Sequence, residues 1–203
     1  MTSEDHSQER GRQTRADIVQ VARRLFSEYG YFGTSLSDIQ DATGLTKGAF
    51  YHHFSTKEDL ALAVLECARG DYQKHLLAPF EDLPAGERFA ATLDAIYLLN
   101  AQPEWRNCQM LATLCAELTN QEPRLQEAVR KLQQGMFGFF RDLIQGAQKA
   151  GDTCPGVVPE VYAQWIVSTL TGTQVARKLG SACVAPDQIF KAIKSAVLKH
   201  PGP

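Results

Sequence analysis

Apolar residues recur at steps of three and four along most of this chain, the spacing that places them on one face of an α-helix. The first such segment spans residues 15–30, and Gly30 supplies its stop signal. Its apolar positions are Ile18, Val21, Ala22, Leu25, Phe26 and Tyr29. Strand alternation, internal repeats and low-complexity tracts are all lacking in the sequence, so the pattern predicts an all-α protein.

Three further helices are predicted directly after Gly30, and each has a residue that can cap it. Thr34 or Ser35 can cap the first of these helices, which Gly44 ends. Thr46 can cap the second, residues 47–53, and Ser55 or Thr56 can cap the third. Glu58 and Asp59 fall in the first turn of the last of these helices, where the helix dipole favours acids.

The rest of the chain repeats the helical period after proline and glycine breaks. Five more helices are expected at residues 87–101, 104–118, 122–151, 160–180 and 187–200. The longest carries one apolar stripe, formed by Leu125, Val129, Leu132, Met136, Phe140, Leu143 and Ala147. The whole pattern therefore predicts about nine helices.

Two short helices joined by the tight turn "ATGLT" and backed by a long first helix form the arrangement of a helix-turn-helix. Gly44 suits the turn because the chain leaves the first short helix there in a left-handed conformation. The residues expected to share a small core with the first helix are Leu36, Ile39, Ala42, Leu45 and Phe50. Those left facing outward are Thr46, Lys47, Gly48, Ala49, Tyr51 and His52.

The outward residues suit a nucleic-acid surface. Lys47 can reach a guanine edge or a phosphate, Ala49 can touch a thymine methyl group, and Gly48 lets the backbone approach the groove wall. Tyr51 and His52 carry polar tips that can bond phosphate oxygens. Lys57 adds a cation beside a helix N-terminus. Burial of this stretch in a helical hairpin and metal binding by the adjacent histidines are the weaker alternatives, since neighbouring helical positions point about 100° apart.

Charge is distributed unevenly. The formal net charge is −2, yet residues 10–57 hold seven basic and four acidic side chains, which leaves +3 there and −5 elsewhere. A local basic excess favours a polyanion as partner. No apolar run is long enough to span a membrane, and the N-terminus lacks the apolar block of a signal peptide, so we expect a cytoplasmic protein. The five cysteines have no CxxC spacing, and we expect reduced thiols, no metal site and no cofactor.

The stretch "TSLSDIQDATGLTKGAFYHHFSTKEDL" resembles the DNA-binding signature of the TetR family of bacterial transcriptional regulators. The resemblance covers about the first 60 residues, whereas the remaining chain is similar only in helix number and length. It implies that Ser37, Thr46, Lys47, Ala49 and His52 face bases or the groove, and that Thr34, Tyr51 and Lys57 contact phosphates. Gln40 stands where the family commonly has alanine, so its longer side chain must bend to the surface.

The resemblance also divides the chain into a disordered tail (1–11), a helix-turn-helix domain (12–57) and a domain for ligand binding and dimerisation (58–203). It implies an effector pocket between the fourth and seventh helices, for a small hydrophobic or electrophilic molecule. The candidate ligand-binding residues are Tyr97, Asn107, Cys108, Thr113, Glu117, Phe140 and Arg141. Cys108 is also similar in position to a sensor cysteine of one TetR subset, although the ordinary role for Cys108 and Cys115 is apolar filling.

The last two helices carry large apolar residues with small ones between them. We expect a homodimer interface there, as a four-helix bundle with the partner's copies, although packing within one chain is an alternative. The candidate interface residues are Trp165, Ile166, Thr169, Gly172, Thr173, Ala176, Phe190 and Ile193.

The predicted function is a ligand-responsive DNA-binding transcriptional regulator, most simply a repressor that a small effector releases from a palindromic operator. Activation instead of repression is left open. An all-helical, thiol-dependent enzyme is the rival, but the sequence has no catalytic cluster, phosphate loop or metal signature at a recognisable spacing. A structural helical adaptor would leave the outward polar residues of 46–52 without a purpose.

Overall fold

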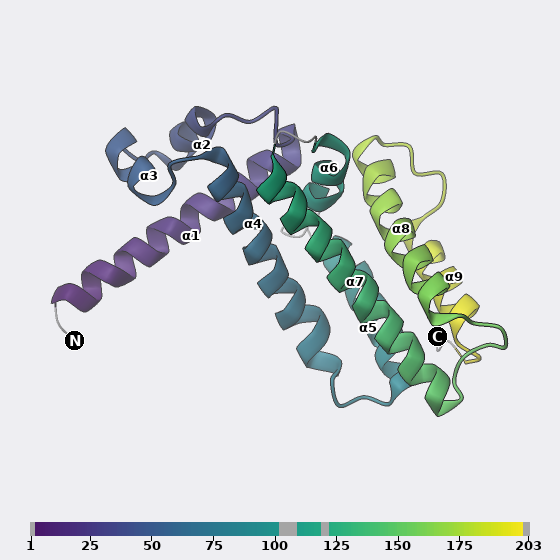
Figure 1. Cartoon of the computed structure of the whole chain (residues 1–203). Coiled ribbons are helices and arrows are strands. Elements are labelled where there is room, and N and C mark those ends of the chain that lie inside the picture. Colours follow the sequence, from purple (N-terminus) through teal and green to yellow (C-terminus); the bar gives the residue numbers. More distant parts are fainter. Residues whose placement is uncertain (1–2, 102–108, 119–121, 201–203) are drawn as a thin grey trace.

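The computed structural model describes residues 3–101, 109–118 and 122–200, and within these ranges every regular element is a helix (Figure 1). In chain order the α-helices are α1 Ser3–Tyr29, α2 Leu36–Thr43, α3 Lys47–His53, α4 Lys57–Tyr72, α5 Ala85–Ala101, α6 Gln109–Glu117, α7 Pro123–Ala150, α8 Pro159–Lys178 and α9 Pro186–Val197. A π-helical turn, Gln73–Leu77, and a short 3-10 turn, Ala78–Phe80, follow α4. The all-α prediction is confirmed. The predicted start of the sixth helix, residues 104–108, lies outside the described ranges.

α1 differs from the prediction at both ends. It begins at Ser3, so the described part of the expected disordered tail, residues 3–11, is helical. Near its other end Tyr29 is 60% exposed rather than buried, whereas Tyr31, just after the helix, is 1% exposed. Gly30 has a φ of 83° and turns the chain so that Tyr31 enters the core in place of Tyr29.

The two short helices are fixed by local hydrogen bonds. Ser35 and Asp38 form a capping box at the start of α2, in which the Ser35 hydroxyl accepts from the Asp38 N–H at 3.1 Å and the Asp38 carboxylate accepts from the Ser35 N–H at 2.7 Å. Gly44 ends α2 with a φ of 67°, as the turn requires. The Thr46 hydroxyl then accepts from the Ala49 N–H and starts α3. The predicted bounds of α3 are confirmed.

The first hydrophobic core holds α1–α4 together and does not stop at residue 57. Ile18, Ile39, Phe50 and Leu60 have no exposed surface, and they form one cluster with buried residues of α6 and α7. The residues contributed by α6 and α7 are Leu114, Leu125 and Val129. The helix-turn-helix therefore shares its core with the larger domain.

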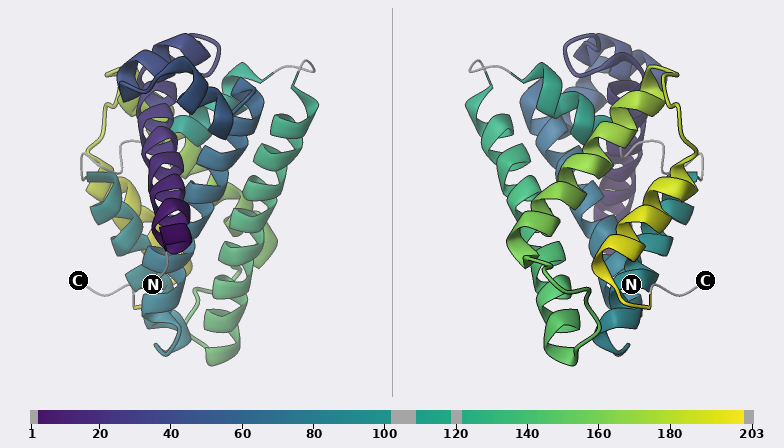
Figure 2. Two further views of the ribbon diagram at one scale, coloured as in Figure 1. Left: turned by 90° about the vertical axis from the view of Figure 1, so that its left-hand side faces the viewer. Right: turned by 90° about the vertical axis from the view of Figure 1, so that its right-hand side faces the viewer.

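The second core lies among α5, α7, α8 and α9, and it includes Phe89, Phe140, Ile166 and Ile193. α7 belongs to both cores because its apolar stripe is long enough to pass from one to the other. α8 and α9 lie on the side of the molecule away from α3, as Figures 1 and 2 show.

Candidate nucleic-acid interface and effector cavity

α3 buries one side chain and exposes most of the others. Phe50 has no exposed surface and packs in the first core, and the Tyr51 ring meets it edge-on at 5.5 Å between centroids. The exposed residues of this segment are Thr46, Lys47, Gly48, Ala49, Tyr51 and His52. Their predicted outward placement is confirmed, whereas their contacts with DNA stay predictions.

α2 presents Ser37 to solvent as expected, but two neighbours differ from the prediction. Ala42 is exposed, so its predicted place in the small core is wrong; Ile39 is buried and Leu36 packs against the core from a half-buried position. Gln40 is half-buried, and its amide donates to the Leu45 carbonyl at 3.2 Å. The longer side chain thus bridges the turn between α2 and α3.

Thr34 and Lys57 do not have the free side chains that a phosphate contact needs. Thr34 is 2% exposed, and its hydroxyl donates to the Gly30 carbonyl at 2.8 Å. The Lys57 ammonium donates to the Tyr31 and Thr34 carbonyls at 3.1 and 3.2 Å and lies 4.4 Å from the centre of the Tyr31 ring. Both side chains bind the backbone of the turn before α2, an arrangement that differs from their predicted contacts with phosphates.

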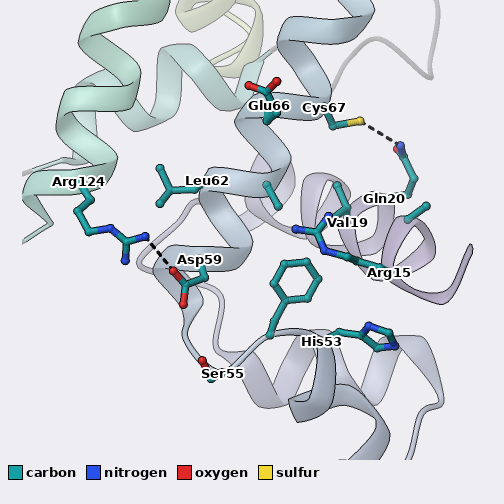
Figure 3. Close-up of a pocket in the computed structure, with 13 residues that line it drawn as sticks. Arg15, Val19, Gln20, His53, Ser55, Asp59, Leu62, Glu66, Cys67 and Arg124 are labelled. Atoms are coloured by element: carbon teal, nitrogen blue, oxygen red, sulfur yellow. Dashed lines mark hydrogen bonds and ion pairs between the residues drawn. The ribbon is translucent and has the colours of Figure 1, made fainter. Parts of the chain in front are cut away.

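His53 is half-buried on the inner edge of α3, beside the junction with α4. It lines a cleft of about 680 Å³ between α1 and α4, in which Arg15 and Cys67 also lie (Figure 3). Burial, followed by the nearby His52 and Arg15, lowers the pKa of His53. The Arg15 guanidinium stacks over the buried Phe54 ring at 4.7 Å.

Glu117 joins the larger domain to the helix-turn-helix, a role that the sequence analysis missed. Its carboxylate accepts from the backbone N–H of Tyr31 at 2.8 Å and of Phe32 at 3.3 Å. The Tyr31 hydroxyl donates to Glu122 at 3.0 Å, and burial together with this bond raises the pKa of Tyr31. The Glu117 carboxylate is thus engaged by the turn before α2, and its predicted contact with a ligand stays a prediction. A carboxylate at a helix C-terminus, where the dipole disfavours it, was the available signal.

Arg124 makes a second link between the two parts of the chain. Its guanidinium lies 3.0 Å from both Glu58 and Asp59 in the first turn of α4. Figure 3 shows the bond to Asp59 at the edge of the cleft beside α4. Glu117 thus connects α6 to the turn before α2, and Arg124 connects α7 to the start of α4.

A second cavity, of about 660 Å³, lies between α4 and α7 and reaches α5 and the π-helical turn. Its wall is largely apolar and includes Leu65, Ile96, Met136, Phe139 and Phe140. The volume is in the range of small-molecule sites. The half-buried members of the α7 stripe, Leu132 and Met136, line this cavity and also pack against the first and the second core, respectively.

Of the predicted ligand-binding residues that the structure describes, only Phe140 lines this cavity. Tyr97 lines a separate cavity of about 250 Å³ between α5, α8 and α9. The Thr113 hydroxyl accepts from Lys178 at 3.3 Å, and Arg141 pairs with its neighbour Asp142 at 2.7 Å. These three assignments to the effector cavity are corrected, because the helical period alone does not say which neighbour each face meets.

Asn107 and Cys108 lie outside the described residues, and the sensor role of Cys108 stays a prediction. Cys115 is half-buried, accepts from the Gln133 amide at 3.0 Å, and has its pKa raised by burial. A raised pKa disfavours the reactive thiolate, which fits the filling role. Among the described residues no His, Cys, Asp or Glu cluster could hold a metal, and no described helix is long and apolar enough to cross a membrane.

The predicted dimer residues divide into two groups. Ile166, Phe190 and Ile193 are buried in the chain's own second core, so their assignment to the interface is wrong. Trp165 and Gly172 are exposed, whereas Thr169, Thr173 and Ala176 are half-buried. A continuous exposed stripe, which we call the α8 stripe, repeats at alternating steps of three and four residues. It consists of Val158, Val161, Trp165, Ser168, Gly172, Val175 and Leu179.

The exposed α3, the capped turn before it and the supporting α1 define a helix-turn-helix DNA-binding protein. The family model described as bacterial regulatory proteins, tetR family, matches residues 18–64. The HTH-type transcriptional repressor DhaR of Mycobacterium sp. (strain GP1) is 25% identical over 191 residues, which are 91% of this chain and 92% of DhaR. Residues 18–64 thus match the DNA-binding domain of the tetR family of bacterial regulatory proteins, and the similarity to DhaR extends over most of the chain.

Solved structures have the same fold. A TetR transcriptional regulator from Chloroflexus aurantiacus superposes with a TM-score of 0.76 at 27% identity, over 91% of this chain and 94% of that one. AibR, in complex with isovaleryl coenzyme A and operator DNA, superposes with a TM-score of 0.70 at 22% identity, over 89% and 95%. At that identity the likeness to AibR is one of fold. DhaR is described as a transcriptional repressor, and the Chloroflexus protein as a transcriptional regulator.

Proposed function

We propose that this TetR-family protein is a homodimeric, cytoplasmic repressor that leaves a near-palindromic operator when a small molecule fills the cavity between α4 and α7. The observation that carries the proposal is the exposed polar face of α3, whose only buried side chain in the core is Phe50. Bacterial chromosomal DNA lies in the cytoplasm, which is why the protein is assigned there.

The proposed DNA contacts come from α3 and the outer side of α2. Lys47 and Ala49 read base edges, while Tyr51 and His52 bind phosphate oxygens. Gly48 allows the backbone to approach the groove wall, and the small hydroxyls of Ser37 and Thr46 complete the surface. Each subunit places its α3 in the major groove, and two half-sites one helical turn apart, about 34–36 Å, match the twofold symmetry.

The proposed dimer interface is the α8 stripe. A row of apolar side chains at alternating steps of three and four residues is the pattern that packs a second helix, and Ser168 and Gly172 leave room for close approach. Trp165, 41% exposed at the middle of the row, is a suitable anchor for the interface. A second copy of the same stripe satisfies the closed symmetry of a homodimer.

The proposed response to the effector runs through α4. Three residues separate the end of α3 from the start of this helix, and its later turns line the cavity. Glu117 and Arg124 connect α6 and α7 to the turn before α2 and to the first turn of α4. An effector that binds one arrangement of α4 more tightly than the other changes the distance between the two reading helices and so lowers DNA affinity.

Selection of binding sites from random duplex DNA tests the proposal. We expect enrichment of a palindrome whose half-sites are separated by one helical turn or a multiple of it. The selected operator then serves in a release assay with a panel of small molecules. Recovery of no palindrome, or of an operator that no panel compound releases, counts against a dimeric, ligand-released repressor.

A further inference from the structure

The cavity between α4 and α7 combines an apolar wall with a cationic edge. Alongside the apolar side chains, its charged lining consists of Arg23, Arg69 and Lys131 against one carboxylate, Glu66. The lining therefore has two more cations than anions, and each cation pairs with a carboxylate: Arg69 with Glu66 of the same lining, Arg23 with Asp71 and Lys131 with Glu127. Asp71 and Glu127, which pair with Arg23 and Lys131, are not part of the wall.

The three cations occupy different depths. The Arg23 side chain is 6% exposed, and its guanidinium meets Asp71 at 2.6 Å. The side chains of Arg69 and Lys131 are 57% and 70% exposed, so they stand at the solvent edge. A negative group on a ligand thus meets cations at the mouth of the cavity and again at its inner wall.

This arrangement discriminates among ligand charges. A cationic ligand would add positive charge to a lining that already has an excess of it, and a neutral apolar ligand would gain nothing from the three cations. An anion beside the buried Arg23 gains a charge-assisted hydrogen bond where little water competes, and a planar guanidinium can hold a carboxylate through two N–H groups. The apolar wall then accommodates the rest of the molecule.

We propose that the effector is an amphipathic organic anion, with an apolar body against α4, α5 and α7 and a carboxylate among the three cations Arg23, Arg69 and Lys131. This inference rests on the proposed function, because it takes this cavity as the effector site. It goes further in assigning the charge and the shape of the ligand.

Matched probes that differ only in their head group test the charge. Calorimetric titration of the full-length protein compares hexanoate, octanoate, decanoate and 4-phenylbutyrate with the corresponding alcohols and ammonium compounds. We expect at least one carboxylate to bind about tenfold more tightly than its alcohol, as a charge-assisted hydrogen bond provides. Equal affinity within every pair, or no binding of any carboxylate, overturns the inference.

Two neighbouring residues of α7 provide a matched pair of variants. Lys131 lines the cavity and Arg130 does not, although both pair with Glu127. Lys131→Gln should weaken carboxylate binding about two- to threefold, the scale of an exposed ion pair, and leave alcohol binding unchanged. Arg130→Gln should change neither. Equal effects of the two substitutions contradict the cationic edge.

Asp71→Asn gives a change in the opposite direction. Because Asp71 competes with a ligand carboxylate for Arg23, its neutralisation should raise the preference for carboxylate over alcohol at least about twofold. A purely structural role of Asp71 would weaken both probes alike, and that result contradicts the inference. Operator binding without ligand is measured in parallel: if it persists while the carboxylates fail, the anion assignment falls and the DNA-binding function stands.

Discussion

The exposed faces of α3 and α8 are built from opposite chemistry. α3 shows solvent a lysine, a glycine, an alanine, a tyrosine and a histidine, whereas the α8 stripe shows valine, tryptophan and leucine with two small residues between them. A surface that binds DNA is exposed to solvent whenever the DNA is absent, so polar and small side chains suit it. An apolar row of that length is suited to a protein partner that stays bound, and large exposed apolar patches generally mark protein interfaces.

The largest effect is expected from breaking the α8 stripe. Gly172 is exposed and has open space around an added Cβ, so Gly172→Arg should fold normally within one chain. At a dimer interface the same change buries a charge and a large side chain, and it should convert dimers to monomers. Operator affinity should then fall by about a hundredfold or more, because the two helix-turn-helix domains are no longer linked.

Gly70→Arg is the control for this substitution, since Gly70 is also an exposed helical glycine with open space around it. Light scattering and operator titration measure both variants. A Gly172→Arg protein that stays dimeric would place the interface elsewhere.

A smaller effect is expected from removing one cation of α3. Lys47→Ala should weaken operator binding by about 1–3 kcal/mol if Lys47 contacts a base. If Lys47 contacts a phosphate, the slope of log affinity against log salt concentration should decrease in magnitude by about one. Lys149→Ala, an exposed lysine at the far end of α7, should change neither quantity. Titrations of the operator at several salt concentrations measure both. Unchanged affinity for Lys47→Ala would exclude this lysine from the DNA surface.

Two glycines near α3 separate folding from DNA binding. Gly44 has a φ of 67°, and Gly44→Ala should lower the free energy of unfolding by about 1–2 kcal/mol, the cost of left-handed backbone in a residue with a Cβ. Gly48 is helical with open space around it, so Gly48→Ala should raise that free energy by up to about 1 kcal/mol while weakening operator binding. Urea unfolding and operator titration give the two readings. Equal stability of both variants would contradict the role of the turn.

The smallest effect concerns His53, whose pKa is lowered in the fold chiefly by burial. Below the ordinary pKa of about 6.5 the unfolded chain binds a proton that the folded protein resists, so stability should fall as the pH drops through that range. His53→Gln should flatten this pH dependence, whereas His52→Gln, at an exposed position, should flatten it less. Melting temperatures between pH 5 and 8 provide the measurement. Identical pH profiles for His53→Gln and His52→Gln would contradict an effect of the burial of His53 on stability.

The helical period and the caps of the sequence were enough to predict the helices, the turn at Gly44 and the exposure of Lys47, because these depend on neighbours along the chain. Thr34 and Lys57 were assigned to phosphates by resemblance, yet their side chains bind backbone carbonyls of the turn beside them. Ile166 and Phe190 show a related limit. An apolar residue on an amphipathic helix can face its own core or a partner, and only the three-dimensional arrangement decides between them.

The shared core has a practical consequence for building chimeric regulators. A helix-turn-helix domain cut out at residue 57 and joined to another ligand-binding domain would lose Leu114, Leu125 and Val129. These residues pack in the first core with residues of α1 and α4. The excised domain would also lose the Glu117 carboxylate that caps two of its backbone amides. A hybrid that keeps its shape must carry these four side chains, or equivalents supplied by the new module, across the junction.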